Sequence, residues 1–404
     1  MTTVVVSAHN VANFPEGGGH VWAYLQYVRG LQQAGCEVWW LERFRDSDDA
    51  QGDRRRLREF RRRMEPFGLA DRLILYTLDR ANATKEGPEG NEGHPRYMTM
   101  SARQANEVFR RADLLLNFYY AIPPVLLARF ARTALVDIDP GLLQVWMSTG
   151  QLAVAAHDVY LTTGETVGTP AARFSDCGLR WVHLPRPVSL QDWPLQDDPP
   201  REMFTTVSSW WADEWVDDGL QMYENNKRVT FLDFADLPQL SGQQLELAAN
   251  LGPGDRDDVR RLQAGGWRVR HVSEVATTPA AYRQYVQRSR GEFSCAKPSC
   301  MKLNNAWVSD RTLCYLASGR PAVVQDTGPS AYLDSRHGVL RFSTVAEAID
   351  ALSEVTSRYG HHSRAARELV QTHFDAKTVA QRLLELTLGR ISDQARPSTG
   401  ATTG

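Results

Sequence analysis

The chain contains 404 residues, of which 46 are lysine or arginine and 48 are aspartate or glutamate, so its formal net charge is -2. This length favours two domains, and the near-neutral balance gives no general attraction to nucleic acids or membranes. A hydrophobic content of 42% and a charged content of 23% exclude fibrous and wholly disordered proteins. No apolar run is long enough to span a bilayer and no leader pattern precedes Val4, so we expect a cytoplasmic protein.

The five cysteines are too few and too scattered for a disulfide framework. Cys295 and Cys300 lie five residues apart, but no second pair of cysteine or histidine residues lies nearby to complete a zinc site. We therefore expect reduced thiols, no bound metal ion and no cofactor.

The first half of the chain alternates apolar runs with segments of helical periodicity. An apolar run at residues 4–6 is followed by a glycine-rich loop, a helical pattern that ends at Ala34-Gly35, and a second apolar run at residues 38–41. Further strands are expected at residues 73–76, 114–118, 134–138 and 159–162. Strands that alternate with helices predict a parallel, doubly wound sheet.

A proline-rich, acidic segment at residues 183–202 predicts a linker, and the strand pattern then restarts. Strands are expected at residues 204–207, 245–248, 267–272, 291–295 and 322–324, and helices at residues 345–359 and 364–388. The predicted fold class is therefore α/β with two Rossmann-like domains, at residues 1–184 and 203–372. A linker at 185–202, a C-terminal helix at 373–390 and a disordered tail at 391–404 complete the organisation.

Open parallel sheets bind ligands beyond the carboxyl ends of their strands, so the loops at those ends are the first candidates for a site. In the first domain these loops hold His9, Gly18, Gly19, Asp139 and Glu165. Glycines allow a close approach of the backbone to a substrate. They do not continue into a dinucleotide fingerprint, so an ordinary loop is the alternative.

His20 stands at the start of the first expected helix. An imidazole with a pKa near neutrality suits a general base, and a carboxylate such as that of Asp139 would orient the ring. The spacing is equally compatible with a histidine that only caps the helix or packs.

In the second domain the densest polar stretch is at residues 291–328. Ser309 precedes residues at helical spacing and predicts a helix N-terminus, where Lys297 and Arg311 would suit a diphosphate. Asp310, at the same N-terminus, is a further candidate for donor recognition. An ordinary αβ unit with surface cations is the alternative. The loop after the following strand adds three candidates, Asp326, Thr327 and Gly328.

The segment SDRTLCYLASGRPAVVQDTG, residues 309–328, resembles the donor-binding element of GT-B nucleotide-sugar glycosyltransferases. The segment GGGHVWAYLQYVRGLQQAGCEVWWL, residues 17–41, is similar to the opening of the same enzymes. The resemblance covers residues 4–388 and implies two Rossmann-like domains that face a central cleft. It also implies that the first domain binds the acceptor, that the second binds the nucleotide sugar, and that His20 is the general base of an inverting transfer.

The chain also departs from this family pattern. Retaining members carry two glutamates eight residues apart, and plant-type inverting members carry histidine and glutamate there, whereas the matching positions here are Ala306 and Cys314. Donor recognition must use other residues, for which we predict Lys227, Ser208 and Ser209 in addition to those above. The missing glutamates, together with His20, favour inversion.

Two further features have competing interpretations. Trp210 belongs to an aromatic cluster that would line an acceptor pocket by stacking, although burial in a core is the alternative. The run RRRLREFRRR at residues 54–63 would bind an anionic partner or form a solvated helix face.

We therefore predict a metal-independent glycosyltransferase that moves a sugar from a nucleoside diphosphate to a hydroxyl or thiol of a small acceptor. The resemblance suggests acceptors of natural-product or antibiotic pathways. A nonhydrolysing nucleotide-sugar 2-epimerase and an inactive nucleotide- or sugar-binding module are the alternatives. The expected partners are the nucleotide sugar and the acceptor, without nucleic acid or membrane, and a homodimer stays open.

Overall fold

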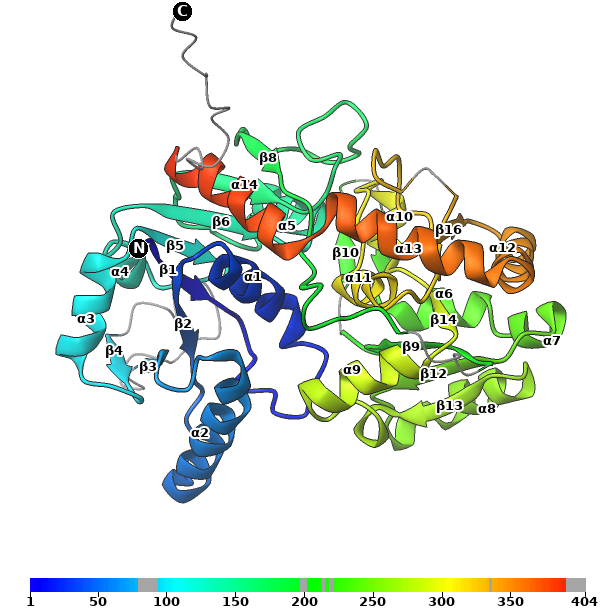
Figure 1. Ribbon diagram of the computed structural model, residues 1–404, viewed down its shortest axis with the longest axis horizontal. Coiled ribbons are helices and arrows are strands. Elements are labelled where there is room, and N and C mark those ends of the chain that lie inside the picture. The colour runs from blue at the N-terminus through cyan, green and yellow to red at the C-terminus, as the bar shows by residue number, and fades with distance from the viewer. Residues whose placement is uncertain are drawn as a thin grey trace, which may run out of the picture.

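The computed structural model describes residues 1–78, 94–196, 202–212, 215–217, 219, 221–333 and 336–389. These residues form two α/β halves that lie side by side, each built around its own sheet (Figure 1). The predicted class, α/β with parallel sheets, is confirmed. The predicted tail at residues 391–404 and part of the predicted linker, residues 197–201, lie outside the described residues.

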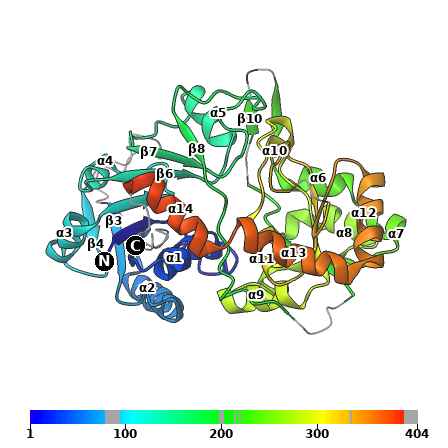
Figure 2. The ribbon, with the colours of Figure 1, turned by 45° about the horizontal axis from the view of Figure 1, so that its top comes forward.

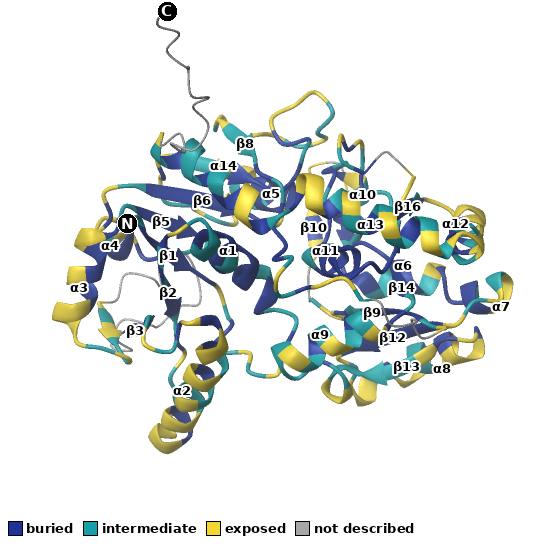
Figure 3. Cartoon of the chain, viewed as in Figure 1, coloured by how far each residue is buried: buried dark blue, intermediate teal, exposed yellow. Residues whose placement is uncertain are grey.

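The first sheet has eight strands in the order β4-β3-β2-β1-β5-β6-β7-β8, and every neighbouring pair is parallel except β3 and β4. Its central strand β1 is buried along its whole length, because helices cover both faces of the sheet (Figure 3). The sequence of a strand that is buried on both faces is a continuous apolar run, without the alternation of apolar and polar residues found in half-buried strands. The strands are β1 (Thr3–Ser7), β2 (Glu37–Arg43), β3 (Leu73–Leu78), β4 (Pro95–Tyr97), β5 (Leu114–Asn117), β6 (Thr133–Asp137), β7 (Val159–Thr162) and β8 (Trp181–His183).

Five helices of the first half connect these strands: α1 (Trp22–Gln33), α2 (Ala50–Met64), α3 (Ala102–Arg111), α4 (Pro124–Leu127) and α5 (Leu142–Ser148). The basic run at residues 54–63 lies on α2, which buries Phe60 and Met64 against the sheet and exposes most of its arginines. Figure 1 shows α2 at the lower edge of this half.

The second sheet has six parallel strands in the order β13-β12-β9-β14-β15-β16. Its strands are β9 (Phe204–Ser208), β12 (Leu245–Ala249), β13 (Arg268–His271), β14 (Gly291–Ser294), β15 (Ala322–Gln325) and β16 (Val339–Phe342). The helices of this half are α6 (Lys227–Asp233), α7 (Leu237–Ser241), α8 (Arg256–Ala264), α9 (Pro279–Arg288), α10 (Pro298–Lys302), α11 (Asp310–Ala317), α12 (Val345–Ser357) and α13 (Tyr359–His373).

A hairpin of β10 (Trp215–Asp217) and β11 (Met222–Glu224) lies apart from both sheets. Its inward residues Val216 and Tyr223 pack with Leu142 and Val145 of α5 in the first half. The turned view in Figure 2 shows β10 beside the loops that flank α5. The hairpin therefore joins the two halves on one side of the cleft.

The end of the chain returns to the first half. Helix α13 packs on α11, whereas the next helix, α14 (Ala376–Leu388), packs on α1 (Figure 1). Asp375 separates them and caps α14 by accepting the Thr378 backbone N–H at 3.1 Å. No described helix is both long and apolar enough to cross a bilayer. All five cysteines are free thiols.

The glycine-rich loop before α1 is a contact between the halves. The Gly18 amide donates to the Ala276 carbonyl at 3.0 Å, and a Cβ on Gly18 would lie 2.3 Å from that oxygen. A Cβ on Gly19 would lie 2.7 Å from the Tyr282 ring. This corrects the prediction that Gly18 and Gly19 approach a substrate, because the backbone they approach belongs to the second half.

Candidate active site

A cavity of about 450 Å³ lies between the halves, at the carboxyl ends of β1, β5 and β6. Its volume is within the range of small-molecule sites. His9, His20 and Asp139 reach it from the first half, and Asp310 reaches it from the start of α11 in the second half. The sequence predicted all four residues as site residues, and the fold brings them to one cavity. Aromatic side chains form much of the wall: Tyr24, Phe118, Tyr119, Tyr120 and Trp307.

The imidazole of His20 is held by a backbone carbonyl. Its Nε2 lies 2.9 Å from the His9 carbonyl oxygen, which also accepts the Tyr24 hydroxyl at 3.2 Å. Because a carbonyl oxygen only accepts, Nε2 carries the proton and Nδ1 holds the lone pair. Burial desolvates the charged ring and lowers the pKa of His20 below its usual value, so the ring is neutral at pH 7. A neutral imidazole with a free lone pair is a competent proton acceptor.

Asp139 does not orient His20, which corrects the prediction. Its carboxylate accepts the Tyr120 hydroxyl at 3.2 Å, and that hydroxyl also receives the Asp139 backbone N–H at 3.2 Å. The negative charge of Asp139 acts on His20 only through space and partly opposes the lowering of its pKa. The orienting group is instead the His9 carbonyl.

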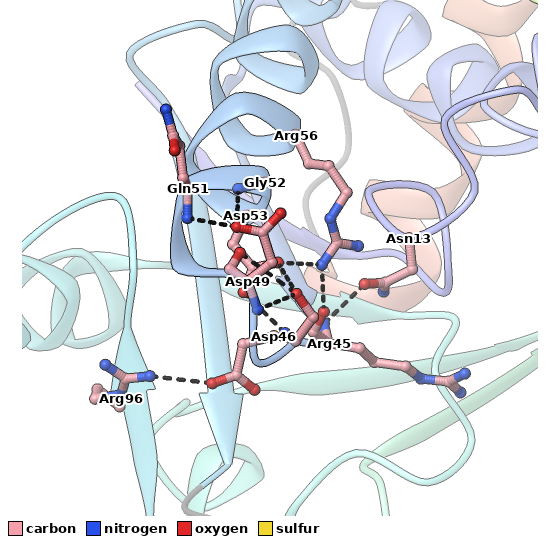
Figure 4. Close-up of polar contacts among 10 residues, drawn as sticks. Asn13, Arg45, Asp46, Asp49, Gln51, Gly52, Asp53, Arg56 and Arg96 are labelled. Atoms are coloured by element: carbon pink, nitrogen blue, oxygen red, sulfur yellow. Dashed lines mark hydrogen bonds and ion pairs between the residues drawn. The ribbon is translucent and has the colours of Figure 1, made fainter.

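Hydrogen bonds to β2 and to the residues after it hold the loop that supplies this carbonyl, and α2 supports those residues. Buried Glu42 accepts the Ala12 backbone N–H at 2.8 Å, and burial raises the pKa of Glu42 to about 7. Asn13 donates to the Arg43 carbonyl at 2.8 Å and accepts the Arg45 backbone N–H at 2.7 Å. Arg56 of α2 donates to the Arg45 carbonyl at 2.8 Å, so the second turn of α2 supports the loop (Figure 4).

Arg311 is a structural residue, which corrects the prediction that it holds a diphosphate. Its Nε donates to Glu292 Oε1 at 2.6 Å, its Nη1 to the Val207 carbonyl at 2.7 Å and its Nη2 to the Ser294 hydroxyl. Glu292 is completely buried and Arg311 is 7% exposed. Every guanidinium nitrogen is therefore used inside the second half, where the pair ties α11 to β14.

Lys227 differs from Arg311 because no buried carboxylate pairs with it among the described residues. It begins α6, is 9% exposed, and its ammonium makes no ion pair with any described residue. Its Nζ lies 5.7 Å from the centre of the Trp307 ring. Burial, with repulsion from Arg311 and Lys297, lowers the pKa of Lys227 to about 7. No described carboxylate forms an ion pair with this ammonium to offset the cost of its burial, and its donor role stays a prediction.

The other predicted donor residues lie at the ends of neighbouring elements of the second half. Ser208 ends β9 and donates to the Ser209 carbonyl at 3.0 Å, while the Ser209 side chain is exposed. Lys297 directly precedes α10. A cavity of only about 20 Å³ lies among the ends of β14 and β15 and the start of α11. That volume holds about one water molecule, so a diphosphate does not fit there unless a side chain moves.

An ion pair and hydrogen bonds within the second half hold the loop after β15 in place. Asp326 pairs with Arg341 at 2.8 Å and accepts the Gly328 backbone N–H at 2.9 Å. The Thr327 hydroxyl donates to the Trp307 carbonyl at 2.7 Å, which fixes the segment that carries the Trp307 ring. Thr327 and Trp307 both line the small cavity, whereas Asp326 and Gly328 line a separate, open depression.

Two predicted cleft residues have other roles. Trp210 is 1% exposed, packs in the apolar core of the second half and donates to Asp258 at 3.2 Å, so it lines no acceptor pocket. Glu165 accepts the Ala331 backbone N–H at 2.7 Å and the Ser330 hydroxyl. Because Ser330 and Ala331 belong to the second half, Glu165 joins the halves.

Two residues of the cavity, Arg186 and Trp307, were not predicted from the sequence. Arg186 lies in the segment predicted as a linker, yet it is 4% exposed and lines the cavity. Its guanidinium carbon lies 5.8 Å from the centre of the Trp307 ring. Composition marked this segment as a connection, and no local pattern distinguishes a buried arginine there. No group of acidic, histidine or cysteine side chains that could hold a metal ion occurs among the described residues.

No family model and no curated protein sequence matches the chain. Solved structures do share its fold. HepE from Anabaena, in complex with UDP and glucose, aligns with a TM-score of 0.59 at 11% identity over 97% of this chain and 100% of its own. An alpha-glucosyltransferase in complex with UDP and DNA aligns with a TM-score of 0.59 at 10% identity over 95% of this chain and 98% of its own.

Sucrose-phosphate synthase from Thermosynechococcus elongatus aligns with a TM-score of 0.53 at 11% identity over 96% of this chain and 98% of its own. The expected GT-B fold is thereby confirmed over nearly the whole chain. At these identities the likeness concerns the fold, and the activity has to be argued from the site.

Proposed function

We propose that the protein is a glycosyltransferase that moves a sugar from a nucleoside diphosphate to a small acceptor. The observation that carries this proposal is Lys227, a buried ammonium of the second half that forms no ion pair with any described residue. A diphosphate supplies the missing negative charge. UDP in the HepE and alpha-glucosyltransferase structures supports this assignment.

The reaction we propose needs one base and one cation. The acceptor hydroxyl attacks the anomeric carbon, and its proton passes to Nδ1 of His20. The bond between that carbon and the diphosphate oxygen breaks on the opposite face, so the sugar is transferred with inversion. Lys227 stabilises the charge on the leaving diphosphate, which makes a metal ion unnecessary.

Donor binding requires a local movement. The cavity at the start of α11 holds about 20 Å³, and Trp307 lines both this cavity and the larger one of about 450 Å³. We infer that the Trp307 indole moves when the diphosphate enters. The larger cavity then receives the acceptor, in our proposal a small natural product with a hydroxyl or thiol.

The experiment combines each of UDP-, dTDP- and GDP-sugars with candidate acceptors and follows diphosphate release and product stereochemistry by NMR. Acceptor-dependent release with inversion, unaffected by a chelator, is expected. An isomer formed from the nucleotide sugar alone would establish an epimerase instead. Stoichiometric binding without turnover would establish a binding module.

Lys227→Met removes the charge at similar volume, and Lys377→Met is the matched control because Lys377 is exposed on α14. Nucleoside diphosphate affinity should fall at least tenfold in the first variant and stay unchanged in the second. Equal affinities in both variants would contradict the assignment of the diphosphate site.

A further inference from the structure

Arg186 is a second buried cation that forms no ion pair with a described residue. It follows β8 in the segment that joins the halves and is 4% exposed. One Nη donates to the Ile138 carbonyl, Nε is buried without a partner, and the side chain makes no ion pair with any described residue. No described residue accepts a hydrogen bond from the second Nη, and Arg186 lines the cavity of about 450 Å³.

This arrangement does not stabilise the protein by itself. A guanidinium removed from water loses its hydration, and only a carboxylate or a full set of acceptors restores that loss. Arg311 has both, through Glu292 and two further acceptors. Arg186 has one carbonyl and the face of Trp307 at 5.8 Å, and an aromatic face attracts a cation without neutralising it.

The rest of the cavity defines what a ligand must offer. Asp139 and Asp310 line it from opposite halves, and neither forms an ion pair with Arg186. Carboxylates accept hydrogen bonds from hydroxyl groups, whereas Arg186 requires an anion. We propose that the cavity binds an acceptor that carries a phosphate or carboxylate besides its hydroxyl groups, with Arg186 as the counter-charge.

This assignment rests on the proposed function, since it concerns the acceptor of that reaction. Arg186 belongs to the acceptor rather than to the diphosphate because it is bonded to the loop after β6 and shares the cavity with His20. Lys227 belongs to α6 of the second half. Both cations lie within 6 Å of the Trp307 ring, so they define two anion sites that flank one indole.

The test measures anion binding without donor or turnover, so that it is separate from the test of the glycosyltransferase. Inorganic phosphate and acetate are titrated into the full chain, and the unfolding temperature is followed. The proteins are the wild type, Lys227→Met, Arg186→Met, the double variant and Arg180→Met. Arg180 is exposed in the same half and serves as the control. Arg186→Lys keeps the positive charge, so it separates the loss of the charge from a structural effect of replacing this side chain.

The Lys227→Met variant should still bind the anion at Arg186, so its unfolding temperature should still rise with anion concentration. In the double variant, which also carries Arg186→Met, the anion affinity should be about 10- to 100-fold weaker. Arg186→Lys should retain a measurable response, and Arg180→Met should retain all of it. A response to phosphate alone identifies a phosphorylated acceptor, and one to acetate alone a carboxylated acceptor. An anion response that survives Arg186→Met, or that is absent from Lys227→Met, would overturn the inference while nucleoside diphosphate binding at Lys227 could still stand.

Discussion

The pKa of Lys227 predicts that the affinity for nucleoside diphosphates falls as the pH rises. In the free protein, burial and the repulsion of Arg311 and Lys297 lower this pKa to about 7. A bound diphosphate places negative charge beside the ammonium and raises the pKa again. Binding above pH 7 therefore requires the uptake of a proton, and proton uptake becomes more costly with increasing pH.

The magnitude follows from the two pKa values. With a pKa of about 7 when free and an ordinary value of about 10.4 when bound, the dissociation constant rises about 20-fold between about pH 7.5 and pH 9. That factor corresponds to about 1.8 kcal/mol. The nucleotide adds no slope of its own in this range, because its terminal phosphate is already ionised above a pKa of about 6.

Calorimetric titration over this pH range, in buffers of different ionisation enthalpy, measures both the affinity and the proton uptake. The wild type should take up about one proton per diphosphate near pH 8.5. Lys227→Met should bind weakly and without pH dependence, whereas Lys377→Met should follow the wild type. A flat wild-type profile, or the same slope in Lys227→Met, would refute the reasoning.

Three further predictions concern the same residues. Without ligand, Lys227→Met should be more stable than the wild type by about 1 to 4 kcal/mol near pH 7 in thermal unfolding. The pKa of Lys227 is lower in the folded than in the unfolded state, so the wild type gains stability as the pH rises. The higher stability of Lys227→Met relative to the wild type should therefore vanish above about pH 10.4. A difference in stability that grows with pH would contradict this. His20→Ala should lower kcat by about 10²- to 10⁴-fold in initial-rate assays and leave the donor dissociation constant unchanged, and normal turnover with a hydroxyl acceptor would exclude it as the base. Arg311→Met leaves Glu292 buried without a cation and should cost about 3 to 5 kcal/mol in denaturant unfolding, whereas full stability with lost diphosphate binding would restore Arg311 as a ligand.

Much of the fold could be predicted because strands buried on both faces are readable in the sequence. The apolar runs at residues 4–6, 38–41 and 322–324 lie in β1, β2 and β15. Strand β8 was not predicted, since its three residues are only half-buried at the edge of the sheet. Strand β16 was also missed. The expected helical segment at residues 364–388 is interrupted at Phe374 and Asp375, where the chain crosses back to the first half.

The site was predictable where topology alone positions residues. His9 and Asp139 follow parallel strands, whose carboxyl ends meet at one edge, and both reach the same cavity. The partners of these residues could not be predicted. The His9 carbonyl, not Asp139, holds His20, because the backbone path of the loop decides which group lies within 3 Å of the ring. The role of Arg186 could not be predicted, because the composition of the segment that contains it indicates only a connection between domains.

Arg311 and Lys227 differ in their partners, and this difference is the reason why our proposal assigns only Lys227 to a ligand. Both are basic residues buried in the second half, and the sequence places both near strand ends. Arg311 meets Glu292, which comes from β14, nineteen residues earlier in the chain. Lys227 faces the Trp307 ring and two other cations, forms no ion pair with a described residue, and is affected by the charge of Glu292 only through space. An unpaired buried charge destabilises the protein, and this cost is the reason for our proposal that a ligand supplies the missing partner. Arg186 likewise forms no ion pair with a described residue, and in our proposals a substrate supplies the anion at each cation, the nucleotide sugar at Lys227 and the acceptor at Arg186.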